Sequence, residues 1–186
     1  MRRLSQLGML LTILSVPVYK WAHPPLPIPQ NDQPLTPETI DRDWQAEQDR
    51  KAVENDARIA EETLSQLGCE DYDFSPVSIA QAARAQNLSV RLVSAQVMVE
   101  SSCRETAISS AGAVGLMQVN VKVWPYSKQE MLDPDRNLQA GTKILANYIR
   151  ESGNVRDGLR HYYGILPDST ASDEYADKVL SMTRRR

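Results

Sequence analysis

Glu100 is the residue whose type and position most clearly predict chemistry. It stands at the end of an apolar stretch, residues 92–99, that is expected to form a helix. A carboxyl group carried on a largely buried helix is costly to ionise, so its pKa should rise. A carboxyl group with a raised pKa can act as a general acid near neutral pH. One buried glutamic acid could therefore be the whole catalytic apparatus.

A glycine-rich segment follows this acid and is predicted to form the floor of a groove. Residues 109–118 read Ser-Ser-Ala-Gly-Ala-Val-Gly-Leu-Met-Gln. Gly112 and Gly115 allow backbone conformations and close approaches that side chains would block, which suits a surface against which a sugar ring lies. Such a segment taken alone is more often a turn. Its position downstream of Glu100 favours the binding interpretation.

Four motifs in this order resemble the soluble-type lytic transglycosylases, which have a goose-lysozyme-like fold. They are the Glu-Ser pair at 100–101, the glycine-rich segment, Asp-Pro-Asp-Arg-Asn-Leu-Gln-Ala-Gly at 133–141, and a tyrosine-centred helix near Tyr162. The resemblance runs from about Ser75 to Met182. It implies a single all-α, lysozyme-like (goose-type) catalytic domain that needs no cofactor.

The resemblance also implies roles for individual residues. Glu100 would be acid and base, Ser109 would contact the N-acetyl group of the substrate, and Tyr162 would reach the Glu100 carboxyl and orient it. The residues expected to contact the glycan are Ser101, Ser109, Gly115, Met117, Gln118 and Tyr162. Ser101 could instead be a helix-terminal serine, and Met117 an ordinary core residue.

Several neighbouring polar and aromatic residues have two interpretations each. Asn120 and Trp124 could touch a saccharide, although a lone tryptophan is at least as often part of the core. Asp133 and Asn137 match the family pattern, but short polar groups at this place are better explained as turn formers and caps of a helix beginning near residue 138. Glu105 stays open as a second carboxylate.

The implied reaction is cleavage of the β-1,4 bond between N-acetylmuramic acid and N-acetylglucosamine, with formation of a 1,6-anhydro end. Most glycosidases use two carboxylates, so the lack of an obvious second acid favours this reaction over hydrolysis by a muramidase. The sequence His-Tyr-Tyr-Gly-Ile at 161–165 departs from the family's Ala-Tyr-Asn-Ala-Gly. This departure keeps a third alternative, a catalytically weak peptidoglycan-binding or assembly factor.

Charge and histidine content exclude other classes. The formal net charge is −3 over 186 residues, which gives no broad basic field for nucleic acid. With only His23 and His161 and two separated cysteines, no metal site of plausible spacing is expected. The expected partners are peptidoglycan glycan strands and, by analogy, a secretion, conjugation or phage-entry machine.

The N-terminal residues 1–22 are predicted to be a signal peptide or a signal anchor. Arg2 and Arg3 precede a mostly apolar stretch at 7–18, the pattern of an export signal. This stretch is short for a bilayer span, and the cleavage site near Ala22 is poor, so both forms stay open. The expected location is the periplasm or cell envelope, with membrane anchoring by this segment as the alternative.

Export would place Cys69 and Cys103 in an oxidising compartment, where two cysteines make one bridge. Pairing would close a loop of roughly 34 residues and contribute about 3 kcal/mol in the chain-entropy model. It would also hold the end of the helix that carries the acid. The alternative is a pair of unpaired buried thiols.

The elements that must position the site are predicted to be helices. Residues 23–70 should form a proline-rich spacer followed by a charged helix from 38 to 67, and Gly68 should end this helix. The helix is expected to dock on the domain, to pair with a partner helix or to act as a spacer. Residues 71–186 should form the catalytic domain. Its helices are expected from Pro76, from Ser89 (as cap) to Glu100, and over 138–149, 155–163 and 174–182. Because no alternating strand is evident, the domain should be all-α.

Overall fold

The computed structural model describes residues 36–164 and 169–184. The chain divides into two units, residues 1–36 and 37–186. The predicted signal segment (1–22) and almost all of the proline-rich spacer lie outside the described residues and stay predictions. The elements are α1 (Pro37–Leu67), α2 (Pro76–Ala85), α3 (Val90–Ser101), β1 (Ala113–Val114), β2 (Val119–Asn120), α4 (Lys128–Met131), α5 (Pro134–Ser152), α6 (Val155–Tyr163) and α7 (Thr170–Thr183). This arrangement confirms the predicted all-α domain.

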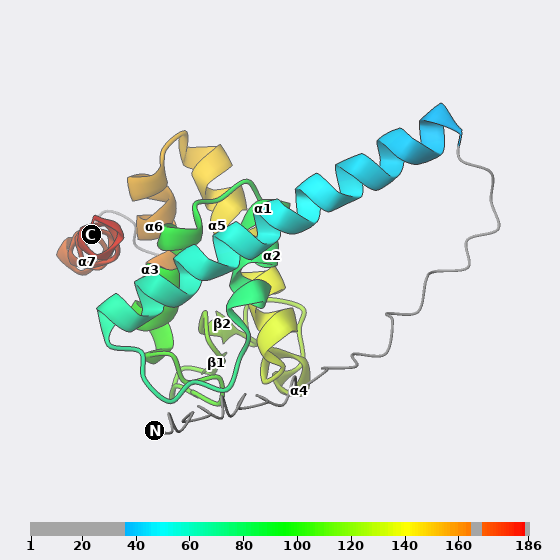
Figure 1. Cartoon of the computed structure of the whole chain (residues 1–186). Coiled ribbons are helices and arrows are strands. Elements are labelled where there is room, and N and C mark those ends of the chain that lie inside the picture. Colours follow the sequence, from blue (N-terminus) through cyan, green and yellow to red (C-terminus); the bar gives the residue numbers. More distant parts are fainter. Residues whose placement is uncertain (1–35, 165–168, 185–186) are drawn as a thin grey trace, which may run out of the picture. The chain divides into compact units, whose positions relative to one another are not determined.

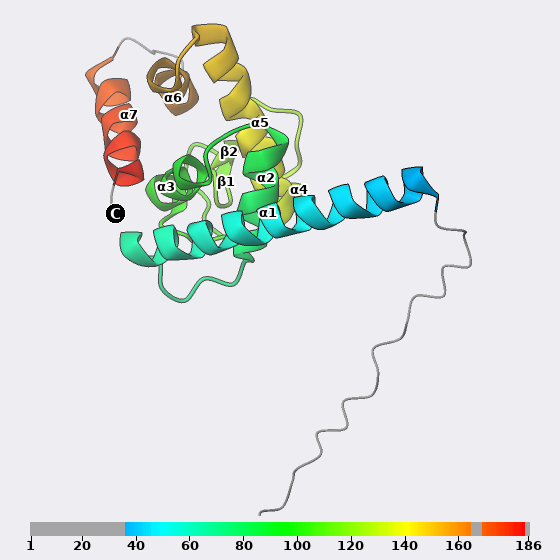
Figure 2. The same ribbon diagram turned by 45° about the horizontal axis from the view of Figure 1, so that its top comes forward.

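Helix α1 has two dissimilar halves (Figure 1). Its buried residues, which pack against α2 and α3, all lie in the C-terminal half: Ala57, Ala60, Thr63, Leu64 and Leu67. The N-terminal half extends beyond the other helices in both views (Figures 1 and 2). Arg50 pairs there with Glu47 and Glu54 on the helix surface. One half of α1 therefore docks, and the other is held by its own local contacts.

The C-terminal end of α1 is fixed to the end of α3. Gly68 ends α1 in the left-handed region (φ +81°), as predicted. Cys69 and Cys103 form a disulfide with their Cα atoms 5.9 Å apart, which confirms the predicted pairing. Ser102 and Cys103, directly after α3, both have positive φ (50° and 62°), a region that costs non-glycine residues free energy. The bridge thus anchors a strained backbone just beyond Glu100.

The starts of α2 and α3 differ from each other in how they are capped. The side chain of Ser75 accepts a hydrogen bond from the backbone N–H of Val77 (3.2 Å), and Pro76 occupies the first helical position. Ser89 stands at the N-cap of α3, but its side chain makes no capping hydrogen bond. The expected cap is therefore wrong in its chemistry, and α3 is held mainly by burial of its apolar side chains.

Asn137 joins the glycine-rich segment to α5. Its side-chain amide donates to the carbonyls of Val114 (2.8 Å) and Met131 (2.9 Å), and its Oδ1 accepts from the backbone N–H of Met117 (2.8 Å). The sequence predicted a helix cap for Asn137, and this is wrong because α5 begins earlier, at Pro134. Asp133 is the cap of α5, since its carboxylate accepts from the N–H of Arg136 (3.0 Å).

The glycine-rich segment forms a small antiparallel hairpin, with Ala113 opposite Asn120 and Val114 opposite Val119. Two-residue strands are too short to show alternation in a sequence. Gly115 lies in its turn with φ +79°, and a Cβ there would stand 2.3 Å from Nδ2 of Asn137. Only glycine fits this position, for both backbone and packing reasons.

Helices α5, α6 and α7 are neighbours in space as well as in the chain (Figure 2). Helix α6 packs on α5 and α7, and α7 packs on α3. Asp173 of α7 forms ion pairs with Arg160 (3.0 Å) and Arg156 (3.4 Å) of α6. Among the described residues, no helix has both the length and the apolar character needed to cross a membrane.

Candidate active site

Glu100 lies in the last turn of α3 and faces a groove of about 900 Å³. The groove is lined by Glu100, Ala111, Ala113, Gln118, Asn120, Val123, Trp124, Tyr148, Glu151, His161, Tyr162, Tyr163, Gly164 and Ser169. The hairpin forms one wall, and residues of α5 and α6 form another. The predicted acid therefore sits where an extended ligand can reach it.

The surroundings of Glu100 favour its neutral form. Burial raises the pKa of Glu100 from an ordinary value of 4.5 to about 7, while a hydrogen bond from Tyr175 and the positive charge of Lys178 act to lower it. A carboxyl group with this pKa can give up a proton and take one back near neutral pH. The sequence-based expectation of a raised pKa agrees with these surroundings.

The hydrogen bond to Glu100 comes from a residue that the sequence did not single out. The hydroxyl of Tyr175 on α7 donates to Oε1 of Glu100, and the side-chain amide of Gln96 donates to the Tyr175 hydroxyl (3.3 Å). Tyr175 looked like core because it shares a helix face with Val179 and Met182. A signal was nonetheless present, since the hydroxyl of a buried tyrosine usually needs a partner.

Tyr162 does not make the contact expected of it. Its hydroxyl donates to the backbone carbonyl of Met117 (2.7 Å), and the hydroxyl bound to Glu100 is that of Tyr175. Tyr162 lines the groove and lies near enough for the charge of Glu100 to contribute to its raised pKa. Its role is to tie α6 to the hairpin beside the acid.

Three of the residues predicted to contact the glycan do not line the groove. Ser101 is buried and its hydroxyl donates to the carbonyl of Val97 (3.0 Å), so it is the helix-terminal serine of the alternative interpretation. Ser109 accepts from the N–H of Ala113 (3.0 Å) and is not among the residues that line the groove. The side chain of Met117 is fully buried, so it belongs to the core.

The other two predicted contacts shape the floor. Gly115 is buried and sets the turn of the hairpin. Gln118 lines the groove, has a positive φ of 48°, and donates from its side chain to the carbonyls of Gly115 (3.0 Å) and Ala107 (3.2 Å). These bonds fix the orientation of the Gln118 amide and leave its Oε1 as the group that can face a ligand.

Aromatic rings form most of the far wall. Trp124 and Tyr148 meet edge to face with centroids 6.3 Å apart, and Tyr148 meets His161 in the same way at 5.8 Å. Tyr163 is 52% exposed and packs against the ring of Tyr175 at 5.1 Å. Asn120 and Trp124 line the groove, as the sequence allowed. Such rings suit the apolar faces of sugars.

A smaller hollow of about 350 Å³ lies on the α7 side of the acid. It is lined by Val99, Glu100, Tyr163, Ala171, Glu174, Tyr175 and Lys178. Glu100 and Tyr163 line both this hollow and the groove. The acid is therefore reached from two directions, and Tyr163 stands at the junction.

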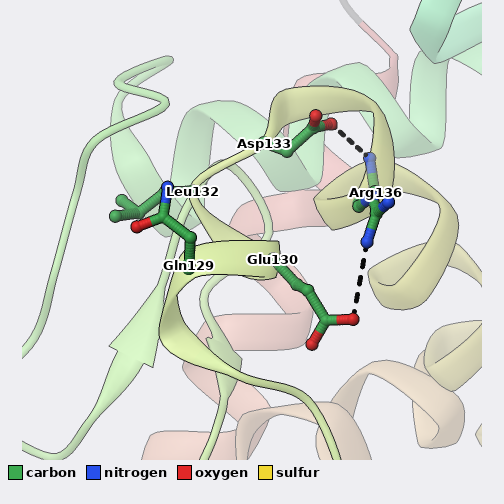
Figure 3. A pocket seen from close by; sticks show the side chains of 5 residues that line it. All are labelled: Gln129, Glu130, Leu132, Asp133 and Arg136. Carbon is green, nitrogen blue, oxygen red and sulfur yellow. Dashed lines mark hydrogen bonds and ion pairs between the residues drawn. The ribbon is translucent and has the colours of Figure 1, made fainter.

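The other acidic residues differ in their access to the groove. Glu151 lines it at an exposed position, which the sequence did not reveal, whereas Glu105 does not line it. Asp133 belongs to a separate hollow around α4 (Figure 3), with Arg136 between it and Glu130. As the sequence indicated, Asp133 has a structural role, as the N-terminal cap of α5.

Comparisons with known proteins agree with this geometry. Residues 77–166 match the family model described as the transglycosylase SLT domain. The endo-type membrane-bound lytic murein transglycosylase A of Citrobacter koseri is 34% identical over 94 residues, which cover 44% of this chain and 45% of that protein. The protein of the same name from Cronobacter sakazakii is 36% identical over 88 residues, which cover 41% and 42%. A transglycosylase of Enterobacteria phage PRD1 is 32% identical over 92 residues, which cover 47% and 33%. The match thus spans less than half the length of each relative.

Proposed function

We propose that this chain is a peptidoglycan lytic transglycosylase with Glu100 as its single general acid and base, because residues 77–166 match the family model of the transglycosylase SLT domain. The observation that carries the proposal is the placement of Glu100. It is partly buried, it has a raised pKa, and it faces a groove walled by aromatic rings. The substrate would be the glycan strand of peptidoglycan.

The proposed reaction needs one proton carrier. Protonated Glu100 donates to the oxygen that links N-acetylmuramic acid to N-acetylglucosamine, and the bond between this oxygen and C1 breaks. Positive charge develops at C1 and is stabilised by the N-acetyl group. The Glu100 carboxylate then takes the proton from the C6 hydroxyl, whose oxygen bonds to C1. The product is a 1,6-anhydro end, no water is consumed, and Glu100 is again protonated.

The surroundings of Glu100 suit both halves of this cycle. Burial stabilises the protonated acid that begins the reaction. The Tyr175 hydroxyl and the Lys178 charge stabilise the carboxylate that forms in mid-cycle, before it takes the proton of the C6 hydroxyl. Acid–base assistance of this kind is typically worth about 10² to 10⁴ in rate.

A muramidase remains the second candidate because Glu151 lines the same groove. A hydrolytic enzyme would need a second carboxylate to activate water or to act as a nucleophile. Glu151 is exposed and lies beside Tyr148, whose pKa its charge helps to raise. If Glu151 is only a groove residue, its replacement by Gln will leave cleavage nearly unchanged.

Mass spectrometry of purified peptidoglycan digested by the full chain tests the proposal. We expect anhydro-muropeptides from the parent and from Glu151→Gln, and none from Glu100→Gln, which keeps the shape of the acid but cannot cycle a proton. Reducing-end products that depend on Glu151 would replace the proposal with the muramidase. Glycan binding without any product would identify a binding factor.

The site of action proposed is the cell envelope. The names of the Citrobacter and Cronobacter relatives describe membrane-bound enzymes of murein, and the disulfide suits an oxidising compartment. The phage relative is consistent with service to a phage-entry machine, and a secretion or conjugation machine fits equally by analogy. Fractionation of cells that produce the full chain would check the location, and recovery in the cytosol alone would contradict it.

A further inference from the structure

Gln96 is an amide buried in an otherwise apolar part of α3. Its side chain is fully buried, and an apolar residue could fill the same space without the cost of removing an amide from water. The Nε2 group donates to the Tyr175 hydroxyl (3.3 Å). Within the described residues the Oε1 atom has no hydrogen-bond partner. The bond to Tyr175 is therefore the contact that this buried amide makes.

Gln96 and Glu100 are four residues apart, so they lie on the same face of α3. Both contact the same Tyr175 hydroxyl on α7: Gln96 donates to its oxygen, and Glu100 accepts its proton. A phenol has one proton to donate and also accepts hydrogen bonds. With the Gln96 N–H at the oxygen, the one proton of the hydroxyl is directed to Glu100.

We propose that Gln96 is a positioning residue that acts through Tyr175 and favours the carboxylate form of Glu100. This inference rests on the proposed function, because a carboxylate that takes back a proton is needed only if Glu100 acts as acid and then base. Gln96 touches neither the groove nor the substrate. Its effect reaches the acid through the orientation of one hydroxyl.

The other titratable groups that share the groove or the smaller hollow with Glu100 are Tyr148 and Glu151 on α5, His161, Tyr162 and Tyr163 on α6, and Glu174 and Lys178 on α7. Among the described residues, none of these groups hydrogen-bonds to Gln96, so replacing Gln96 leaves their charges in place. The substitution Gln96→Met keeps an unbranched side chain of similar length and removes the N–H donor. Gln96→Leu is a second variant of the same kind.

The test is a titration of the glutamate side-chain carboxyls by ¹³C NMR in the full chain, with Glu100→Gln used to assign the Glu100 signal. Gln96→Met should raise the pH midpoint of Glu100 by about 0.3 to 1 unit, the size expected for a weakened neutral hydrogen bond. In a Tyr175→Phe background, the same change should give no further shift, because both residues act through one bond. Ser94→Ala, also buried on α3, should leave the midpoint unchanged.

An unchanged midpoint in Gln96→Met and Gln96→Leu, or an equal shift with and without the Tyr175 hydroxyl, would overturn the inference. Thermal unfolding curves of each variant show whether the fold persists. The titration needs no substrate, so it gives a result even if the proposed reaction is wrong. If the reaction is right as well, the alkaline limb of the pH profile for glycan cleavage will move upward by the same amount in Gln96→Met.

Discussion

The hairpin and the α6–α7 pair both border the acid and contribute different things to it. In the hairpin, the predicted contact residues mostly hold the loop itself: Ser109 bonds to Ala113, and Met117 is core. From α7 come Tyr175 and Lys178, which act directly on the carboxyl of Glu100. The recognisable motif therefore encodes mainly a shape, and the hydrogen bond and the positive charge that act on the buried acid come from a helix beyond the matched residues 77–166.

The largest effect is expected from a change in the shape of the hairpin. Gly115→Ala places a Cβ 2.3 Å from Nδ2 of Asn137 and 2.4 Å from the carbonyl oxygen of Met131. We expect a loss of at least ~3 kcal/mol in unfolding free energy, from the clash added to the positive φ. Urea unfolding measures it.

Gly153→Ala is the matched control, because Gly153 has φ +80° and nothing within 4 Å of the added Cβ. It should lose only about 1 kcal/mol, the cost of the left-handed conformation alone. Equal losses in the two variants would mean that the packing of Asn137 against Gly115 does not hold the loop.

The burial of Glu100 predicts an effect on stability that depends on pH. Because folding raises the pKa of Glu100 from 4.5 to about 7, the folded state binds the proton more tightly. The contribution of this proton to the free energy of unfolding is present in full below pH 4.5 and is lost as the pH rises through 7. The change is about 3 kcal/mol, at ~1.4 kcal/mol per pKa unit. Glu100→Gln removes this dependence.

Unfolding free energies of the parent and Glu100→Gln between pH 4 and 8.5 give the measurement. The difference between the two curves should grow in favour of the Gln variant as the pH rises, while all other titrating groups cancel. Parallel curves would show that Glu100 ionises at the same pH in the folded and unfolded chains.

Tyr163 tests what α6 contributes to glycan binding. This chain has tyrosine where the family that it resembles has asparagine, and the exposed ring stands between the groove and the smaller hollow. Tyr163→Asn should raise the KM for glycan about 2- to 10-fold, since one aromatic contact is worth roughly 0.5–1.5 kcal/mol. Tyr163→Phe keeps the ring and should behave like the parent. If Phe and Asn were equally impaired, the hydroxyl and not the ring would be the binding group.

Lys178 should give the smallest effect. Its charge lowers the pKa of Glu100, so Lys178→Met should move the alkaline limb of the activity profile upward by a few tenths of a pH unit at low salt. Added salt should reduce the difference between parent and variant. Lys128→Met, on α4, is the control of equal charge change. A shift of the same size in both would assign the effect to net charge.

The sequence predicted most helices, and it singled out Glu100 as the candidate acid, because these depend on local patterns. Glu100 follows an apolar run, Gly68 ends α1, and the cysteines pair. The four-residue α4 and the two-residue strands are too short for any period to appear. Such features come from contacts that a linear pattern does not contain.

The family resemblance assigned the contact with the Glu100 carboxyl to Tyr162, whereas the hydroxyl of Tyr175 makes it. Both tyrosines lie on inward faces of C-terminal helices, and either hydroxyl could reach an acid on α3. Which one does so depends on how α6 and α7 rotate and pack against α3, and Tyr175 is 75 residues away from Glu100 in the chain. Asn137 was misassigned for the same reason, because its partners lie in the hairpin.

The disulfide makes the active geometry depend on when and where the chain is oxidised. Ser102 and Cys103 hold left-handed backbone angles two and three residues beyond Glu100, and the bridge to Cys69 keeps them there. A newly made chain with both thiols free would lack this restraint, and we expect the last turn of α3 to fray with the acid on it. Under the proposed function, oxidation after synthesis would complete the site, and glycan cleavage would begin only once the two cysteines had paired.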